Sequence, residues 1–196
     1  GMVLKSSNSN IIDNNKVDYQ HDLGYGIELL NSGNNIITNN SLYYNEFGIY
    51  FQSSHNNIIT NNVVNKNKCH GINLESSNNN TIVNNTVDEN GQNGLVLSKS
   101  RGNTVANNSE YYNAENDIHL WLSDNNIIIN NTLRRSRNGM VLENSHKNKI
   151  IYNYLDQNDL GGIQMESSDF NFLIGNTLWY NYYYGICISS SNYNRI

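Results

Sequence analysis

The chain has 196 residues, a net charge of −5 and a pI near 5.4, with no proline and only two cysteines, Cys69 and Cys187. This acidic balance argues against a nucleic acid or an anionic membrane held by bulk electrostatics, and two cysteines do not make a disulfide framework. No run approaches the ~18 apolar residues of a membrane span, and the first residues, GMVLKSSNSN, lack the long apolar core of a signal peptide.

Asparagine fills 43 positions, and its placement is periodic. One asparagine per repeat marks a period of 22 to 25 residues, and a second stands five residues after each of the first eight markers. Glycine stands nine residues before each marker, with Asp117 as the one exception, and serine follows six residues after that position. The markers are Asn10, Asn35, Asn57, Asn80, Asn103, Asn126, Asn148, Asn171 and Asn194. A fixed period of this length is typical of a solenoid.

The pattern of each repeat predicts three short strands. Residues 71–93 serve as the example, taken in chain order. After the glycine, Ile72 and Leu74 alternate with polar residues, as in a strand with one buried face. Ile82, two residues after the marker, and Val87, seven after it, belong to two further apolar columns. No segment has the length or period of a helix. The pattern therefore predicts a coil of three strands that stacks on its neighbours.

Stacked coils place equivalent residues above one another at ~4.8 Å, so the asparagine and serine columns are expected to form ladders. We expect the ladder asparagines, and the glycine before the first strand, to adopt the left-handed backbone of sharp corners. Length varies only between the second asparagine and the glycine, which is the predicted loop. Leucine-rich repeats share this period, but their L-x-x-L-x-L core is absent.

The stretch SSNNNTIVNNTVDENGQNGLVL at 76–97 resembles the repeat of right-handed parallel β-helix proteins. It is similar both to carbohydrate-binding and sugar-hydrolase β-helices and to the NosD-type copper-maturation proteins. The resemblance implies an all-β, right-handed, single-stranded parallel β-helix of about eight coils with three sheets. It also implies an extracellular, cell-surface or periplasmic location, and it leaves the activity open because the shared residues build the coil.

The two ends of the sequence both match the middle of a repeat. The opening GMVLKS matches GMVLEN at 139–144, and the chain closes on NRI at 194–196. We expect one β-helix domain over residues 1–196 that is a fragment of a longer solenoid. End-to-end self-association through uncapped coils and compact, sufficient termini are the alternatives.

The outward positions of the first strand carry the residues with chemistry. Glu143 and Glu166 occupy one column on adjacent coils, roughly 5 Å apart, which resembles the carboxylate pair of a retaining glycosidase. The expected effect of this like-charge proximity is one raised pKa. The candidate catalytic residues are Glu143, Glu166 and His119, and the candidate substrate-binding residues are Trp121, Glu75, Gln164, Asp117 and Arg137. The alternative is an ordinary polar strand face exposed to solvent.

One repeat departs from the pattern twice. Glu110 stands in an apolar column, and a bulge that lets Tyr111 enter the core instead is the expected solution. Asp117 replaces the glycine, and aspartate tolerates positive φ better than most residues. Nearby, Arg134, Arg135 and Arg137 are expected either to hold an acidic polysaccharide or to pair with neighbours, such as Arg134 with Asp156.

The histidines lie in different columns or on separated coils, so neither a metal nor a cofactor is predicted. They are His21, His55, His70, His119 and His146. The densest aromatic cluster, LWYNYYYGI at 178–186, suits either sugar stacking or cover for the adjacent coil. The leading interpretation is polysaccharide recognition, with hydrolase or lyase activity left open. A non-catalytic repeat module and a NosD-like copper-processing protein are the alternatives.

Overall fold

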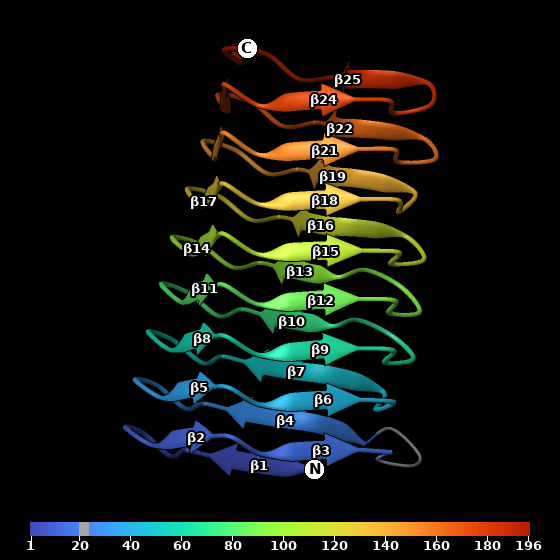
Figure 1. The fold of residues 1–196 in the computed structure, drawn as a ribbon. Coiled ribbons are helices and arrows are strands. Elements are labelled where there is room, and N and C mark those ends of the chain that lie inside the picture. Colours follow the sequence, from blue (N-terminus) through green and yellow to red (C-terminus); the bar gives the residue numbers. More distant parts are fainter. Residues whose placement is uncertain (20–23) are drawn as a thin grey trace.

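The computed structural model describes residues 1–19 and 24–196, which form a right-handed parallel β-helix. The coils rise one above another from the N-terminus to the C-terminus (Figure 1). The predicted fold class is thereby confirmed. Among the described residues, no helix is long and apolar enough to cross a membrane.

Three parallel sheets run the length of the helix. Sheet A contains β1 (Met2–Lys5), β4 (Tyr25–Leu30), β7 (Phe47–Gln52), β10 (Ile72–Glu75), β13 (Leu95–Ser98), β16 (Asn116–Trp121), β19 (Asn138–Glu143), β22 (Gly161–Glu166) and β25 (Tyr184–Ser189). Sheet B contains β2 (Ile11–Asp13), β5 (Ile36–Thr38), β8 (Ile58–Thr60), β11 (Thr81–Val83), β14 (Thr104–Ala106), β17 (Ile127–Ile129), β20 (Lys149–Ile151) and β23 (Phe172–Ile174). Sheet C contains β3 (Lys16–Asp18), β6 (Ser41–Tyr43), β9 (Val63–Asn65), β12 (Thr86–Asp88), β15 (Ser109–Tyr111), β18 (Thr132–Arg134), β21 (Tyr154–Asp156) and β24 (Thr177–Trp179).

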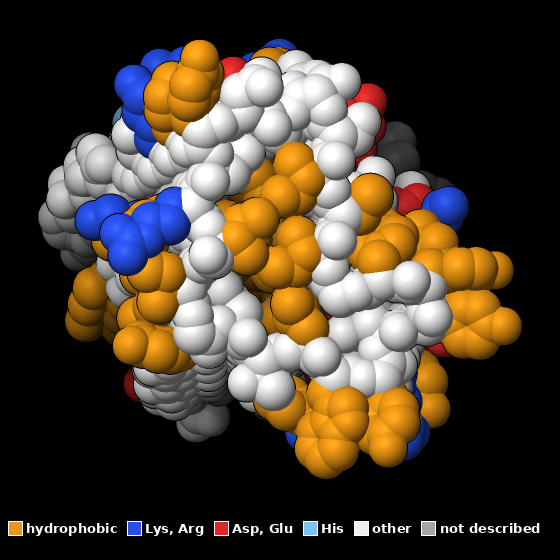
Figure 2. All heavy atoms as spheres, turned by 90° about the horizontal axis from the view of Figure 1, so that it is seen from above, with side chains coloured by type: hydrophobic (Ala, Val, Ile, Leu, Met, Phe, Trp, Pro, Cys, Tyr) orange, Lys and Arg blue, Asp and Glu red, His pale blue; other side chains and the backbone are white. Residues whose placement is uncertain are grey.

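The core is the set of apolar columns that the sequence predicts. Ile72, Leu74, Ile82 and Val87, one coil's contribution, are all fully buried. Viewed down the axis, apolar side chains fill the middle of the cross-section within a ring of backbone and polar atoms (Figure 2). Strand register aligns equivalent positions throughout, for example Ile72 with Ile49 and Leu95.

The asparagine and serine columns form buried ladders, as predicted. Asn85 donates its side-chain Nδ2 to Asn108 Oδ1 at 3.0 Å and to the carbonyl of Ile59 at 3.0 Å. Its own Oδ1 accepts the backbone N–H of Asn62 at 2.9 Å. Every ladder amide in mid-helix is therefore satisfied by the coils on either side.

A third ladder stands at the corner between sheets C and A, inside the segment predicted to be a loop. Asn90 belongs to it and donates Nδ2 to Asn113 Oδ1 at 3.0 Å. The expected left-handed asparagines are one residue out of place: φ is positive at the residue that precedes each ladder position, such as Asn79 at 57° before Asn80 and Asn84 at 58° before Asn85. The preceding residue makes the corner, which leaves the ladder residue free to point inward.

Glycine recurs before almost every strand of sheet A, and the reason differs from the one expected. Gly71 does not have a positive φ. A Cβ at Gly71 would instead overlap the Val87 side chain, the Gly94 carbonyl and the Asn90 amide. The column is glycine because three parts of the structure converge on it, and not because the backbone is left-handed.

The bulge expected at Glu110 is absent. Glu110 keeps register with Val87 and Leu133, its side chain is fully buried, and neither carboxyl oxygen has a hydrogen-bond partner among the described residues. The carboxyl occupies space beside Gly94 that a Cβ there would need. Tyr111 stays at the surface side of the strand. Register in sheet C is thus maintained at the cost of a buried acid.

Asp117 is also fully buried, and a second exception in the repeat accommodates it. Residue 136 of the third ladder is serine instead of asparagine, so it reaches less far into the corner. Asp117 Oδ1 accepts hydrogen bonds from Asn113 Nδ2 at 2.9 Å and from the Ser136 hydroxyl. The Asp117 carboxyl therefore supplies the oxygen that an asparagine at 136 would have supplied.

Burial raises the pKa of both carboxyls. Burial raises the pKa of Glu110 well above its usual value, and the nearby Asp117 raises it further. Burial raises the pKa of Asp117 to about 8, although its hydrogen bonds from Ser136 and Asn113 lower it. Burial also raises the pKa of Asp88, in the adjacent coil, to about 6. The unfolded carboxyls titrate near ~4.

The substitution Glu110→Leu is expected to stabilise the protein, and more so at high pH. It replaces an unpaired buried acid by the residue type of its column, which at pH 8 should raise the free energy of unfolding by about 2 kcal/mol. Because the folded carboxyls retain protons that the unfolded chain releases, stability of the parent should be highest near pH 4 and fall toward pH 8. Guanidinium unfolding at several pH values measures both effects.

Glu110→Gln is the matched control, since it removes the titrating group but stays polar. We expect it to reduce the pH dependence, leaving the part that comes from Asp117 and Asp88, without the gain in stability of Glu110→Leu. Identical pH profiles for the parent and both variants would show that Glu110 is not a buried protonated acid.

Candidate functional site

A polar cavity of about 180 Å³ lies on the outer face of sheet A, and we call it the sheet-A cavity. Strands β16, β19 and β22 and the turns that lead into them form its walls. Its lining residues are Asn116, Arg137, Asn138, Val141, Glu143, Leu160 and Gln164. The strand alternation that buries Met140 and Leu142 turns Val141 and Glu143 outward, so the cavity follows from the repeat.

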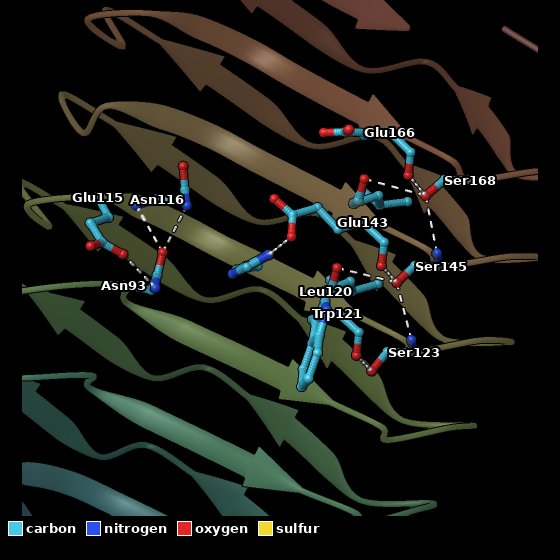
Figure 3. A network of polar contacts seen from close by, with 12 residues as sticks. Asn93, Glu115, Asn116, Leu120, Trp121, Ser123, Glu143, Ser145, Glu166 and Ser168 are labelled. Atoms are coloured by element: carbon cyan, nitrogen blue, oxygen red, sulfur yellow. Dashed lines mark hydrogen bonds and ion pairs between the residues drawn. The ribbon is translucent and has the colours of Figure 1, made fainter. Parts of the chain in front are cut away.

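His119 lies beside the cavity and contacts Glu143. The two side chains come from adjacent strands, with His119 Nε2 3.6 Å from Glu143 Oε2. In Figure 3 a dashed line at the Glu143 carboxylate marks this contact. Burial lowers the pKa of His119, and the negative charge of Glu143 opposes that shift without reversing it. His119 is therefore neutral at neutral pH, and its Nε2 makes no hydrogen bond to a described residue.

A chain of hydrogen bonds runs along one edge of the cavity. Asn138 Nδ2 donates to Asn116 Oδ1 at 2.9 Å, and Asn116 Nδ2 donates to Asn93 Oδ1 at 2.8 Å. Asn93 in turn donates to Glu115 Oε2 at 3.0 Å, and Figure 3 shows this end of the chain. Each amide is fixed by its neighbours, so the polar edge is organised in advance of any ligand.

Tyr184 extends this row of hydrogen-bonded side chains beyond Asn138. Its hydroxyl lies 3.1 Å from Asn138 Oδ1 and 3.0 Å from Gln164 Oε1, so it can donate to either. The ring lies where a Cβ on Gly161 would overlap it, which explains the glycine at that position. Burial raises the pKa of Tyr184, and the positive charge of Arg137 opposes the shift.

Arg137 brings a positive charge to the cavity mouth. Its backbone N–H donates to the Glu115 carbonyl at 2.7 Å, which fixes the turn before β19. Its exposed guanidinium forms no ion pair with any residue in the described ranges. By contrast, Arg134 pairs with Asp156 at 3.8 Å, as one of the sequence alternatives predicted.

Four predicted site residues meet here, and three lie elsewhere on sheet A. His119, Glu143, Gln164 and Arg137 share the cavity region. The predicted partner of Glu143, Glu166, is its register neighbour but does not line the cavity.

Trp121 and Glu75 have other partners. Trp121 carries Lys99 over its ring, with Nζ 5.2 Å from the centroid, and it points away from the Glu143 carboxylate (Figure 3). Glu75 accepts a 2.7 Å hydrogen bond from the Tyr50 hydroxyl, two strands away from Trp121. Neither side chain reaches the sheet-A cavity.

The assignment of Asp117 to substrate binding is wrong. Its side chain points into the core and is fully buried, so a ligand on the outer face of sheet A cannot contact it. Its role is to complete the third ladder beside Ser136.

Sequence reasoning missed Asn116 and Asn138 at the cavity edge, and it named Tyr184 only as part of the aromatic cluster at 178–186. The first two stand directly before the glycine column, as Asn93 does in the coil below. Asparagine at this position in three successive coils was a usable signal. Tyr184 occupies the same column, but nothing in its sequence context separates it from the tyrosines around it.

The described residues contain no group of three or more His, Cys, Asp or Glu side chains able to hold a metal ion. Cys69 and His70 are the one Cys–His pair that is adjacent in sequence, and both make other contacts. Cys69 Sγ contacts Glu46 at 3.1 Å, and His70 Nδ1 accepts the Asn93 backbone N–H at 3.2 Å. His21 lies outside the described residues.

Solved structures share this fold at low sequence identity. A periplasmic alginate epimerase is 23% identical with a TM-score of 0.77, over 93% of this chain and 50% of its own. Tailspike protein 2 of bacteriophage CBA120 is 13% identical with a TM-score of 0.82, over 94% and 35%. DFA-IIIase from Arthrobacter chlorophenolicus A6 is 14% identical with a TM-score of 0.77, over 95% and 63%. The chain thus spans about half the length of the epimerase, and these likenesses show the fold.

A comparison with curated proteins finds no match. A family model described as periplasmic copper-binding protein (NosD) matches residues 1–121 and 110–196, which together span the whole sequence. The chain therefore belongs to the NosD family.

Proposed function

We propose that this protein binds a polysaccharide on the outer face of sheet A, with the sheet-A cavity as its centre. The observation that carries the proposal is the convergence of three features: Arg137, which has no ion-pair partner among the described residues, the His119–Glu143 contact, and a fixed edge of amides and a tyrosine hydroxyl. Sugars present many hydroxyl groups in fixed directions, and organised amide and carboxylate groups match them. One structure with the same fold is named as an alginate epimerase, and alginate is a polysaccharide.

The cavity also contains groups suited to proton transfer. A neutral imidazole is a base at neutral pH, and Glu143 at 3.6 Å would stabilise the imidazolium that forms. In cleavage by hydrolysis, Glu166 on the adjacent strand would be the second carboxylate. In cleavage by a lyase, Arg137 would neutralise a uronate carboxylate. We therefore propose Glu143, Glu166 and His119 as the residues of any catalytic step.

Copper processing is the second candidate, because the family description names copper. Copper in proteins is held by clustered imidazole, thiolate or thioether groups. The described residues contain no group of three or more His, Cys, Asp or Glu side chains, and Cys69 Sγ and His70 Nδ1 make other contacts. The residues present do not fit a copper site, so we assign no step to the metal.

Polysaccharide binding is expected to depend on the cavity. Arg137→Ala and Gln164→Ala should each weaken retention of the best-bound polymer, from a panel that includes alginate, by about tenfold in affinity electrophoresis. Each variant removes a charged or amide contact and leaves the buried columns intact. Arg101→Ala is the control, because Arg101 pairs with Asp124 at 3.7 Å outside the cavity.

Binding by Arg137→Ala equal to that of the parent would contradict a site here and favour a non-catalytic structural module. If the parent cleaves a polymer, Glu143→Gln and Glu166→Gln should abolish the appearance of new chain ends. Full cleavage by both variants would remove them from the mechanism.

The pKa of His119 provides a test of the base that does not require a substrate. It should lie below the ordinary value of 6.5 in the parent, because burial disfavours the charged imidazole. It should fall further in Glu143→Gln, which removes the neighbouring negative charge. NMR titration of the imidazole carbon-bound proton measures both values. A pKa above 6.5 in the parent, or a rise in Glu143→Gln, would show that His119 is not the neutral base described.

A further inference from the structure

A row of exposed side chains follows the corner between sheet C and the next strand of sheet A. One residue per coil there has a φ between 50° and 58°, and none of these side chains contributes to the core. The row contains Tyr19, Tyr44, Lys66, Glu89, Tyr112, Arg135, Gln157 and Tyr180. In Figure 1 it follows the turns after the sheet C strands, such as β15, β18 and β21. Because the coils repeat at ~4.8 Å, neighbours in the row lie within contact distance.

The C-terminal half of this row forms a cavity of about 370 Å³, which we call the corner cavity. Its walls include Tyr112, Arg135, Gln157, Asp159, Tyr180 and Tyr182. It shares no residue with the sheet-A cavity. The two are nevertheless close, since Arg135 in one and Arg137 in the other are two residues apart, at most ~7 Å along the chain.

Arg135 is held in place by neutral groups. Its Nε donates to Gln157 Oε1 at 3.1 Å, and its Nη1 donates to the hydroxyls of Tyr111 at 2.7 Å and Tyr112 at 3.2 Å. It forms no ion pair with a residue in the described part of the chain, and its Nη2 has no hydrogen bond there. A guanidinium has five N–H donors. The two on Nη2 remain for a ligand, and no carboxylate of the described residues lies within 4.0 Å of this guanidinium, although Asp159 lines the same cavity.

Three tyrosine rings with large exposed surfaces line the same cavity as this guanidinium. Tyr112 is 49% exposed, Tyr180 72% and Tyr182 75%. Trp179 stacks behind Tyr180 with ring centroids 5.3 Å apart, which supports the Tyr180 ring from one side. Seen down the axis, aromatic and other apolar side chains project from the rim of the end coil (Figure 2). Rings exposed around a fixed cation are typical of sites that stack a flat apolar face and bind an anionic group.

We propose that the corner cavity binds an acidic sugar unit of a polysaccharide. The carboxylate or sulfate of the sugar accepts hydrogen bonds from Nη2 of Arg135, and the sugar ring packs on Tyr180 or Tyr112. Asp159, on the same wall, accepts a hydrogen bond from a sugar hydroxyl. The inference rests on the proposed function in that both require a saccharide, but it names the class of sugar and uses separate residues.

The test uses three polymers with the intact chain: alginate for carboxylates, dextran sulfate for sulfates, and neutral dextran. Arg135→Gln and Tyr180→Ala should each raise the Kd for the anionic polymer that binds by about tenfold, measured by calorimetry. Both residues are exposed, so thermal unfolding should not change. Lys149→Gln, which removes an exposed charge on sheet B, is the control and should leave binding unchanged. The polymer that binds distinguishes carboxylate from sulfate.

Three outcomes would overturn the inference: no binding of either anionic polymer, equal binding of neutral dextran, or an equal effect of Arg135→Gln and Lys149→Gln. Arg137→Ala separates this inference from the proposed function. Loss of affinity in Arg135→Gln but not in Arg137→Ala would support the corner cavity and contradict the sheet-A cavity. The reverse pattern would support the sheet-A cavity alone.

Discussion

The hydrogen bonds of buried asparagine side chains are the constraint on which the whole structure depends. A buried amide that lacks partners costs about 1–3 kcal/mol. One partner of the Asn85 side chain, the Val83 carbonyl, lies in its own coil, whereas Asn62, Ile59 and Asn108 lie in other coils. One coil alone therefore cannot satisfy all the polar groups of its ladder residues. Stability in such a solenoid therefore resides in the interfaces between coils, and each coil must keep the same residues at the same corners.

This constraint separates structural residues from functional ones. The inward columns are occupied by ladders and apolar side chains, so chemistry can vary only at outward positions and corners. Strand β16 shows both sides of the rule: Asp117 points inward and repairs the ladder beside Ser136, whereas His119 points outward and contacts Glu143. Glu110 also points inward, but its carboxyl has no hydrogen-bond partner among the described residues. Departures of this kind concentrate in the coils next to the sheet-A cavity.

Much of the fold could be predicted because the repeat samples each position many times. A column such as Ile72, Leu95 and Ile118 indicates burial more firmly than any one residue does.

The candidate site was harder to predict than the fold, because it depends on residues that each occur once. His119, Glu143 and Gln164 were found from their outward columns, and Arg137 from the variable segment before its glycine. The burial of Asp117 could not be predicted, because it depends on one serine at 136. The third ladder was missed although its residues stand five positions after those of the second ladder, as Asn45 after Asn40 and Asn67 after Asn62; only the spacing to the glycine varies. The direction in which Trp121 turns depends on its contact with Lys99, which strand alternation alone does not specify.

The central claim is that the inner columns are scaffold and that the outer face of sheet A receives a polysaccharide. A crystal structure of the protein soaked with an oligosaccharide of the polymer that it binds best in solution tests this claim most directly. We predict sugar density in the sheet-A cavity, in contact with Arg137 and Gln164 and within reach of the His119–Glu143 pair. Density confined to sheet B, or an empty cavity at a concentration that saturates binding in solution, would contradict the claim.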